Sequence, residues 1–149
     1  MNHRKPGERQ FTVSDKTAEV LKKGLEYCEM SGGAFDITIE PLSSLWDFAG
    51  ADPAVPESTA IQKALEKVGY KKVLLEGNTV TFADDDTAID LGAIAKGYIA
   101  DRIKDYLTEQ GVKSAIINLG GNVVCVGEKT DGSLLRSVFR NLLQTVRKQ

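Results

Sequence analysis

Two pairs of short apolar segments, each joined by a glycine-containing turn, constrain the fold of this chain most strongly. Residues 72–76 and 79–82 flank Gly77-Asn78, and residues 113–119 and 122–127 flank Gly120-Gly121. Strands that follow one another through so short a connection run antiparallel. The order Gly-Asn, in place of the favoured Asn-Gly, leaves the type of the first turn open. We therefore predict an α+β fold with a mostly antiparallel sheet that contains these four strands and is covered by helices.

Three longer segments have apolar residues at helical spacing and predict the covering helices. The first spans 15–31 with Ser14 or Asp15 as N-cap, the second spans 57–68, and the third spans 93–110. The apolar stripe of the third helix is expected to consist of Ile94, Ile99, Ile103, Tyr106 and Leu107. A short strand over 88–91 is predicted to lead into this third helix, and Pro41 is predicted to open a turn of helix.

The composition excludes several classes of protein. With 149 residues the chain has the length of a single domain, and its 19 basic and 21 acidic residues give a net charge of −2. That balance provides no basic surface for nucleic acid, so we expect no nucleic-acid partner. The apolar runs are too short for a membrane-spanning helix, and the amino end has no apolar segment typical of a signal peptide. Cys28 and Cys125 share no CxxC spacing and are interpreted as two small buried thiols.

The last segment differs in charge from the rest of the chain. Residues 133–149 contain four basic residues and no acidic one, and their apolar residues recur at helical spacing. This pattern predicts a basic amphipathic tail that docks on a partner or a membrane surface, packs on its own domain, or is a poorly ordered end. We accordingly divide the chain into a domain over 1–132 and a tail over 133–149.

The stretch from Asp90 to Tyr98 is the first candidate for chemistry. A helix that starts near Gly92 presents unpaired N–H groups and the positive end of its dipole, and Lys96 lies one turn further along. Asp90 adds a carboxylate at the same corner. These features suit a phosphate-bearing ligand, and the alternative is an ordinary solvated helix start. The P-loop does not match, because it requires Gly-Lys-Ser/Thr and the lysine here precedes the glycine. The dinucleotide fingerprint G-x-G-x-x-G does not match either.

Three further stretches have two interpretations each. In Ala34-Phe35-Asp36 the ring and the carboxylate either hold a flat heterocycle or form a core phenylalanine beside a helix-capping aspartate. Gly120-Gly121-Asn122 is a ligand loop or a tight turn. Asp84-Asp85-Asp86 is a solvated loop or a site for a hard cation.

Taken together, these motifs resemble those of the FAD:protein FMN transferase (ApbE) family. The stretches that carry the resemblance are Ser31 to Leu42 with Leu45 to Phe48, Ile89 to Tyr98 with Asp101-Arg102, and Asn118 to Asn122 ending in Gly127. They occur in the family's order and spacing and cover roughly Val13 to Gly132. Family members continue on both sides of this stretch. The resemblance therefore implies that residues 1–132 are the central part of a flavin transferase domain, with a fold that is incomplete at both ends.

The resemblance also implies an activity and a set of site residues. Members bind FAD and, with Mg²⁺, transfer its FMN half to a threonine hydroxyl of an acceptor protein, and some hydrolyse FAD to FMN and AMP. The family pattern assigns FAD contacts to Ala34, Phe35, Asp36, Asp90 and Lys96, and it assigns the main-chain carbonyl of Ala93 to magnesium.

Several alternatives stay open for this chain. It is an FMN transferase, an FAD pyrophosphatase, a non-catalytic FAD-binding fragment, or a structural remnant that associates with itself through exposed sheet edges or the basic tail. Family members are typically periplasmic or membrane-anchored lipoproteins. Because this sequence shows no signal peptide, it does not indicate where the chain is located.

Overall fold

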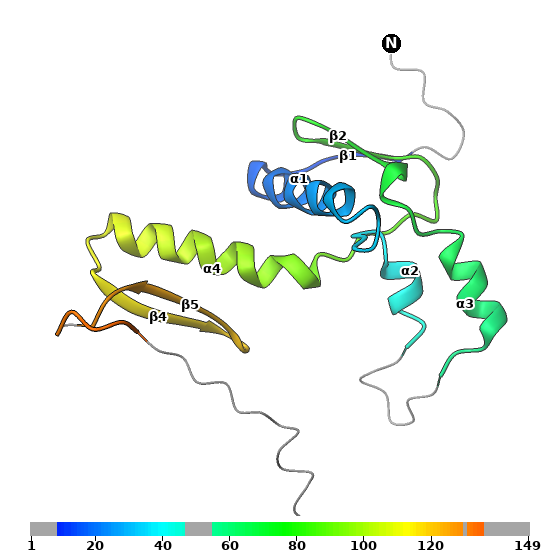
Figure 1. Ribbon diagram of the computed structural model, residues 1–149. Coiled ribbons are helices and arrows are strands. Elements are labelled where there is room, and N and C mark those ends of the chain that lie inside the picture. The colour runs from blue at the N-terminus through cyan, green and yellow to red at the C-terminus, as the bar shows by residue number, and fades with distance from the viewer. Residues whose placement is uncertain (1–8, 47–54, 130, 136–149) are drawn as a thin grey trace, which may run out of the picture. The chain divides into compact units, whose positions relative to one another are not determined.

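The computed structural model describes residues 9–46, 55–129 and 131–135. The chain folds into two compact units, residues 1–95 and 96–149, and each is described by itself. The α+β class and the four predicted strands are confirmed. Among the described residues, no helix is both long enough and apolar enough to cross a membrane. The elements of Figure 1 are, in chain order, β1 (Arg9–Thr12), α1 (Asp15–Met30), α2 (Glu40–Ser43), α3 (Ser58–Leu65), η1 (Tyr70–Lys72), β2 (Val73–Glu76), β3 (Thr79–Phe82), α4 (Gly92–Glu109), β4 (Ser114–Leu119) and β5 (Asn122–Gly127).

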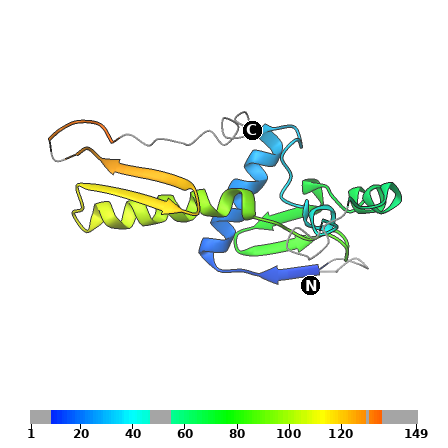
Figure 2. The ribbon, with the colours of Figure 1, turned by 90° about the horizontal axis from the view of Figure 1, so that it is seen from below.

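The first unit is a three-stranded antiparallel sheet in the order β1-β3-β2, with α1 packed on it (Figure 2). Helix α1 begins where the Ser14 hydroxyl accepts a hydrogen bond from the Thr17 N–H at 3.2 Å, as an N-cap does. In the hairpin of β2 and β3 Glu76 pairs with Thr79, so Gly77 and Asn78 form a two-residue turn. Only Gly77 has a positive φ, of 56°, which is the sign pattern of a type II′ turn and settles the turn type that the sequence left open.

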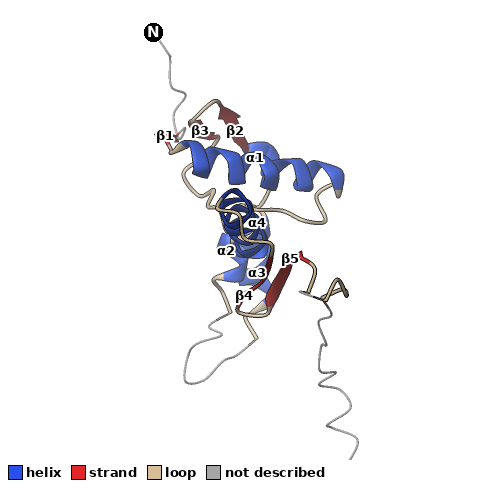
Figure 3. Cartoon of the chain, turned by 90° about the vertical axis from the view of Figure 1, so that its left-hand side faces the viewer, coloured by secondary structure: helices blue, strands red, loops and turns tan. Residues whose placement is uncertain are grey.

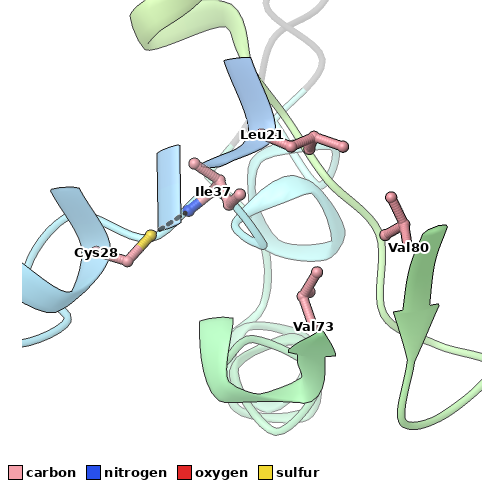
Figure 4. Close-up of a cluster of buried hydrophobic side chains, with 5 residues drawn as sticks. All are labelled: Leu21, Cys28, Ile37, Val73 and Val80. Atoms are coloured by element: carbon pink, nitrogen blue, oxygen red, sulfur yellow. Dashed lines mark hydrogen bonds between the residues drawn. The ribbon is translucent and has the colours of Figure 1, made fainter. Parts of the chain in front are cut away.

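The core of this unit joins the helix to the sheet. Its buried residues are Leu21, Cys28, Ile37, Val73 and Val80, from α1, the loop after it, β2 and β3 (Figure 4). The Ile37 N–H donates to the Cys28 Sγ at 3.3 Å, and burial raises the pKa of that thiol. Cys28 is therefore the inert buried thiol that the sequence predicts, whereas Cys125 is only half-buried.

The second unit consists of the rest of α4 and the hairpin of β4 and β5 (Figure 3). Leu119 pairs with Asn122 across Gly120 and Gly121, whose φ angles are 58° and 96°. Two consecutive positive φ angles define a type I′ turn, which only glycine and a few small polar residues adopt easily. The stretch thus forms a tight turn, and its interpretation as a ligand loop stays a prediction.

The prediction of one sheet for all four strands is wrong, because the described strands form two sheets. Each hairpin pairs within itself, and the third strand of the first sheet is β1, which was not predicted. Strand β1 has only four residues, and α1 and other elements separate it from β3 along the chain. No short turn in the sequence therefore indicates that β1 pairs with β3.

The strand predicted over 88–91 is also absent. The Asp90 N–H makes a single hydrogen bond to the Ile37 carbonyl at 2.8 Å, without a ladder on either side. The chain turns at Asp90 because its carboxylate accepts from the Gly92 N–H at 2.7 Å, an Asx-type turn that starts α4.

The predicted stripe of α4 is correct only in part. Ile103 and Leu107 pack with the buried Ala100, Ile117 and Val126, but Ile99 and Tyr106 are 48% and 60% exposed. A hairpin two strands wide covers a narrow face of a helix, so residues one position away from the stripe stay in solvent.

The predicted tail is described only up to Leu135, where it has no regular structure. Residues 136–149 of the expected helix lie outside the described residues, and the division at Gly132 stays a prediction.

Candidate functional site

The loop that follows α1 is built around the Asp36 carboxylate. Its Oδ1 accepts hydrogen bonds from the Thr38 N–H at 2.8 Å and the Thr38 hydroxyl at 2.6 Å, and its Oδ2 accepts from the Tyr70 N–H at 2.9 Å. A carboxylate has about four acceptor positions, so about one remains for a ligand after these three bonds. Asp36 thus ties its loop to η1, a role that the interpretation as a helix cap missed.

Thr38 and Gly69 complete this arrangement and were not singled out from the sequence. Thr38 is fully buried, and its hydroxyl oxygen accepts from the Gly69 N–H at 2.7 Å. The spacing Asp-x-Thr is typical of an Asx or ST turn and could have indicated the local bonds. No pattern in the sequence indicates that residues 69–70 provide the distant donors.

The two motifs predicted to contact one ligand are neighbours in the first unit. The hydrogen bond from the Asp90 N–H to the Ile37 carbonyl, at 2.8 Å, joins the residue after Asp36 to the residue that starts the second motif. Ile89 and Leu91, on either side of Asp90, pack against the core cluster that contains Ile37. The structure therefore brings Asp36 and Asp90 to one region of the unit, although they lie far apart in the sequence.

The start of α4 is open to solvent. Asp90, Gly92 and Ala93 are exposed, and a Cβ placed on Gly92 would lie 3.0 Å from the Asp90 Oδ1. The absence of a side chain at Gly92 thus lets the carboxylate fold over the first turn. Lys96 is exposed and lies one turn further along the same helix. An exposed helix N-terminus with a lysine in its second turn can attract an anion.

The remaining predicted residues form an apolar edge beside Asp36. Ala34 is exposed, whereas Phe35 is half-buried and meets the Tyr27 ring edge-on, with centroids 6.4 Å apart. Tyr27, Met30, Ser31 and Phe35 line a shallow hollow of about 370 Å³. Such a surface can contact a flat aromatic group while a neighbouring carboxylate accepts its N–H groups.

A larger hollow lies elsewhere in the first unit. It has a volume of about 740 Å³, lies between α1 and β2, and is lined by Leu25, Tyr70 and Leu74 among others. None of the residues predicted to contact a ligand lines it. Size alone therefore does not mark the candidate site, which is identified by its carboxylates and its helix start.

The acidic loop is neutralised by basic side chains. Asp84, Asp85 and Asp86 lie 3.4, 3.7 and 3.2 Å from Lys72, Arg9 and Lys67. The Asp84 Oδ1 also accepts from the Thr87 hydroxyl at 2.7 Å, and this bond, with Lys72, lowers the pKa of Asp84. The loop thus joins three segments of the unit through ion pairs. In the part of the chain that the structure describes, no three acidic, histidine or cysteine side chains group as metal ligands would.

The comparison with protein families decides the relationship of this chain. The model of the ApbE family matches residues 1–142. This chain belongs to the ApbE family. The resemblance that the motifs indicated is thereby confirmed.

Individual relatives agree with this assignment. The chain is 38% identical over 128 residues to an FAD:protein FMN transferase of Klebsiella pneumoniae and 34% identical over 130 residues to one of Treponema pallidum. These matches cover 85% and 83% of this chain but only 40% and 36% of the relatives. The chain therefore spans about two fifths of the length of these ApbE relatives.

Solved structures show the same fold. The flavin transferase ApbE of Vibrio cholerae superposes with a TM-score of 0.77 at 32% identity, over 84% of this chain and 41% of that one. The apo flavinyl transferase ApbE of Pseudomonas stutzeri gives the same TM-score and identity, over 86% of this chain and 41% of that one. The fold of this chain is accordingly that of the matching part of ApbE.

Proposed function

We propose that this chain provides flavin-binding elements of an FAD:protein FMN transferase, which moves FMN from FAD to a threonine hydroxyl of an acceptor protein. The observation that carries the proposal is the hydrogen bond from the Asp90 N–H to the Ile37 carbonyl, which joins the two motifs that we propose to contact flavin. The names of the relatives from Klebsiella pneumoniae and Treponema pallidum support the same activity.

In this proposal the two motifs bind different parts of FAD. Ala34 and Phe35 provide apolar contact for the flavin ring, and the remaining acceptor position of Asp36 receives a flavin N–H. Asp90 accepts from a hydroxyl of the ligand. Lys96 and the N-terminus of α4 attract the pyrophosphate, whose charge they offset.

The transfer requires positioning more than it requires a reactive side chain. The threonine oxygen attacks the phosphorus of the FMN half, the bond from this phosphorus to the oxygen of the AMP phosphate breaks, and AMP leaves while the proton of the hydroxyl passes to water. Lys96 offsets the negative charge on the phosphate oxygens during this step. The chemistry needs no cysteine nucleophile, in agreement with the buried position of Cys28.

The family also implies Mg²⁺, for which the described residues offer few ligands. Magnesium prefers about six oxygen ligands, many of them water or phosphate. The main-chain carbonyl of Ala93 lies in the exposed first turn of α4 and is proposed as one ligand. The described residues contain no cluster of three acidic, histidine or cysteine side chains, so they do not form a magnesium site by themselves, and we assign no step to the metal.

A second candidate is FAD binding without transfer activity. The observation that favours it is that the two motifs are joined in the described residues, whereas those residues contain no group of three acidic, histidine or cysteine side chains that could hold a metal. The two candidates differ in the products that they predict. Transfer gives flavin bound to the acceptor protein together with AMP, FAD hydrolysis gives free FMN and AMP, and simple binding leaves FAD intact.

Lys96→Ala tests the proposed phosphate contact. Titration of the 149-residue chain with FAD, followed by flavin fluorescence, should show binding that Lys96→Ala weakens by about 1.5 to 3 kcal/mol, or about 10- to 150-fold, as expected for a charge-assisted contact. Lys104→Ala is the matched control, because Lys104 is also exposed but lies eight residues further along α4, about 12 Å away. Equal affinities for all three chains would refute the role of Lys96, and no binding of FAD by the unaltered chain would refute the proposed function.

A further inference from the structure

The buried hydroxyl of Thr38 has no place in the proposed chemistry, yet both of its hydrogen-bonding functions are used. Thr38 has an exposed fraction of 0%, and its hydroxyl donates to the Asp36 Oδ1 at 2.6 Å and accepts from the Gly69 N–H at 2.7 Å. Burying a polar group is unfavourable unless its hydrogen bonds are made, so a fully satisfied buried hydroxyl marks a defined local geometry.

These bonds hold the residue that lies between Asp36 and Thr38. The Asp36 carboxylate is fixed by the Tyr70 N–H at 2.9 Å, and Thr38 is fixed by Gly69. Ile37 is itself 1% exposed and packed in the core, so neither its side chain nor its peptide groups can turn freely. The direction of the Ile37 carbonyl is therefore set by the bonds on both sides of it.

The Ile37 carbonyl in turn holds the second motif. It accepts the hydrogen bond of the Asp90 N–H at 2.8 Å, and the Asp90 carboxylate accepts from the Gly92 N–H at 2.7 Å, at the first residue of α4. A continuous series of bonds thus runs from Gly69 through Thr38 and Ile37 to Asp90.

We propose that Thr38 is a positioning residue of the flavin site, whose hydroxyl orients the Ile37 carbonyl and thereby sets Asp90 at the start of α4. The part of this inference that concerns ligand affinity rests on the proposed function, and the part that concerns Asp90 does not. Thr38 touches no substrate in this account and acts only through Ile37 and Asp90.

Two substitutions distinguish the contribution of the Thr38 hydroxyl from the contribution of the volume of its side chain. Thr38→Val keeps the volume and removes the hydroxyl, whereas Thr38→Ser keeps the hydroxyl and removes a methyl group. Thr87→Val is the control, because Thr87 is also buried, at 1% exposed, and its hydroxyl donates to the Asp84 Oδ1 at 2.7 Å, but it makes no bond to residues 36–38.

The first measurement is hydrogen exchange of the Asp90 amide in the full 149-residue chain, followed by NMR and compared with the core amide of Val80. We expect the protection of Asp90 to fall at least tenfold more than that of Val80 in Thr38→Val, and to stay within threefold of the original chain in Thr38→Ser and Thr87→Val. The second measurement is the FAD titration, in which Kd should rise at least tenfold in Thr38→Val only.

Several results would overturn the positioning role. They are an Asp90 amide without protection in the original chain, unchanged protection in a folded Thr38→Val, or a tenfold loss in Thr38→Ser, which retains the hydroxyl. The last result decides the matter even where Thr38→Val does not fold. A chain that shows the expected exchange but binds no FAD would retain the link to Asp90 and refute the proposed function.

Discussion

Gly24 lies in the middle of α1, where a glycine is unfavourable unless space requires it. A Cβ at this position would lie 2.9 Å from the Ile37 Cγ2, 3.1 Å from the Ile94 Cδ1 and 3.2 Å from the Ile37 Cδ1. Carbon atoms that are not bonded prefer about 3.5 to 4.0 Å, so both isoleucines would have to move. Because the Ile37 carbonyl also accepts the hydrogen bond of the Asp90 N–H, a shift of Ile37 away from α1 would also displace a residue that holds Asp90.

Gly24→Ala sets two effects against each other. Alanine is better than glycine in a helix interior by about 1 kcal/mol, whereas overpacking a tight core costs about 1 to 3 kcal/mol. The net expectation is a loss of up to about 2 kcal/mol of unfolding free energy. Gly97→Ala is the matched control in α4, since a Cβ there meets only the Asn122 Nδ2 at 3.9 Å, and it should stabilise by about 1 kcal/mol.

Hydrogen exchange under native conditions measures the stability change caused by each substitution in the structural unit that contains it. The exchange of the buried Val80 amide reports on the first unit, and that of the buried Ile117 amide reports on the second. The substitutions should shift protection in opposite directions. If Gly24→Ala stabilised its unit as much as Gly97→Ala stabilises the other, the tight contact of α1 with Ile37 would be refuted.

Two further predictions concern the acidic loop and the start of α4. The Thr87 hydroxyl, with Lys72, lowers the pKa of Asp84 in the folded chain, so this carboxylate stabilises the fold above its unfolded pKa and that contribution is lost as the pH falls through the folded value. Urea unfolding from pH 6 down to about pH 2 should therefore show an acid-side loss of stability that is smaller in Asp84→Asn, and equal losses in both chains would contradict the role of Asp84. Gly92→Ala places a Cβ 3.0 Å from the Asp90 Oδ1, so the carboxylate must move. The Kd for FAD should therefore rise about threefold to tenfold. An unchanged Kd would contradict a contact between Asp90 and the ligand.

The elements that could be predicted from the sequence are those that depend on local interactions. Both hairpins depend on pairs of residues next to their turns, and α1 depends on the Ser14 cap and its own apolar face. The pairing of β1 with β3 depends on residues that are far apart in the chain. The four residues of β1 are too few to show the alternation of apolar and polar residues that would predict a strand. The partition of the strands into two sheets could not be predicted for the same reason.

The candidate site residues can be named from the sequence, but their arrangement cannot be predicted from it. Asp36 and Asp90 were singled out because carboxylates lie beside glycines, an aromatic ring and a helix start. Their connection through Ile37 is a single long-range backbone bond, which leaves no trace in side-chain patterns. The anchoring of Asp36 by Tyr70 likewise uses a main-chain donor, and any residue other than proline could supply that N–H.

An NMR titration of the ¹⁵N-labelled 149-residue chain with FAD tests directly whether the two motifs bind one ligand. If they form the proposed flavin site, the amide signals of Phe35, Asp90 and Lys96 should shift together along one binding curve. Signals of the hollow between α1 and β2, such as that of Leu74, should stay in place. Shifts confined to that hollow, shifts of the two motifs with different affinities, or no shift at all would contradict a single flavin site built from the two motifs.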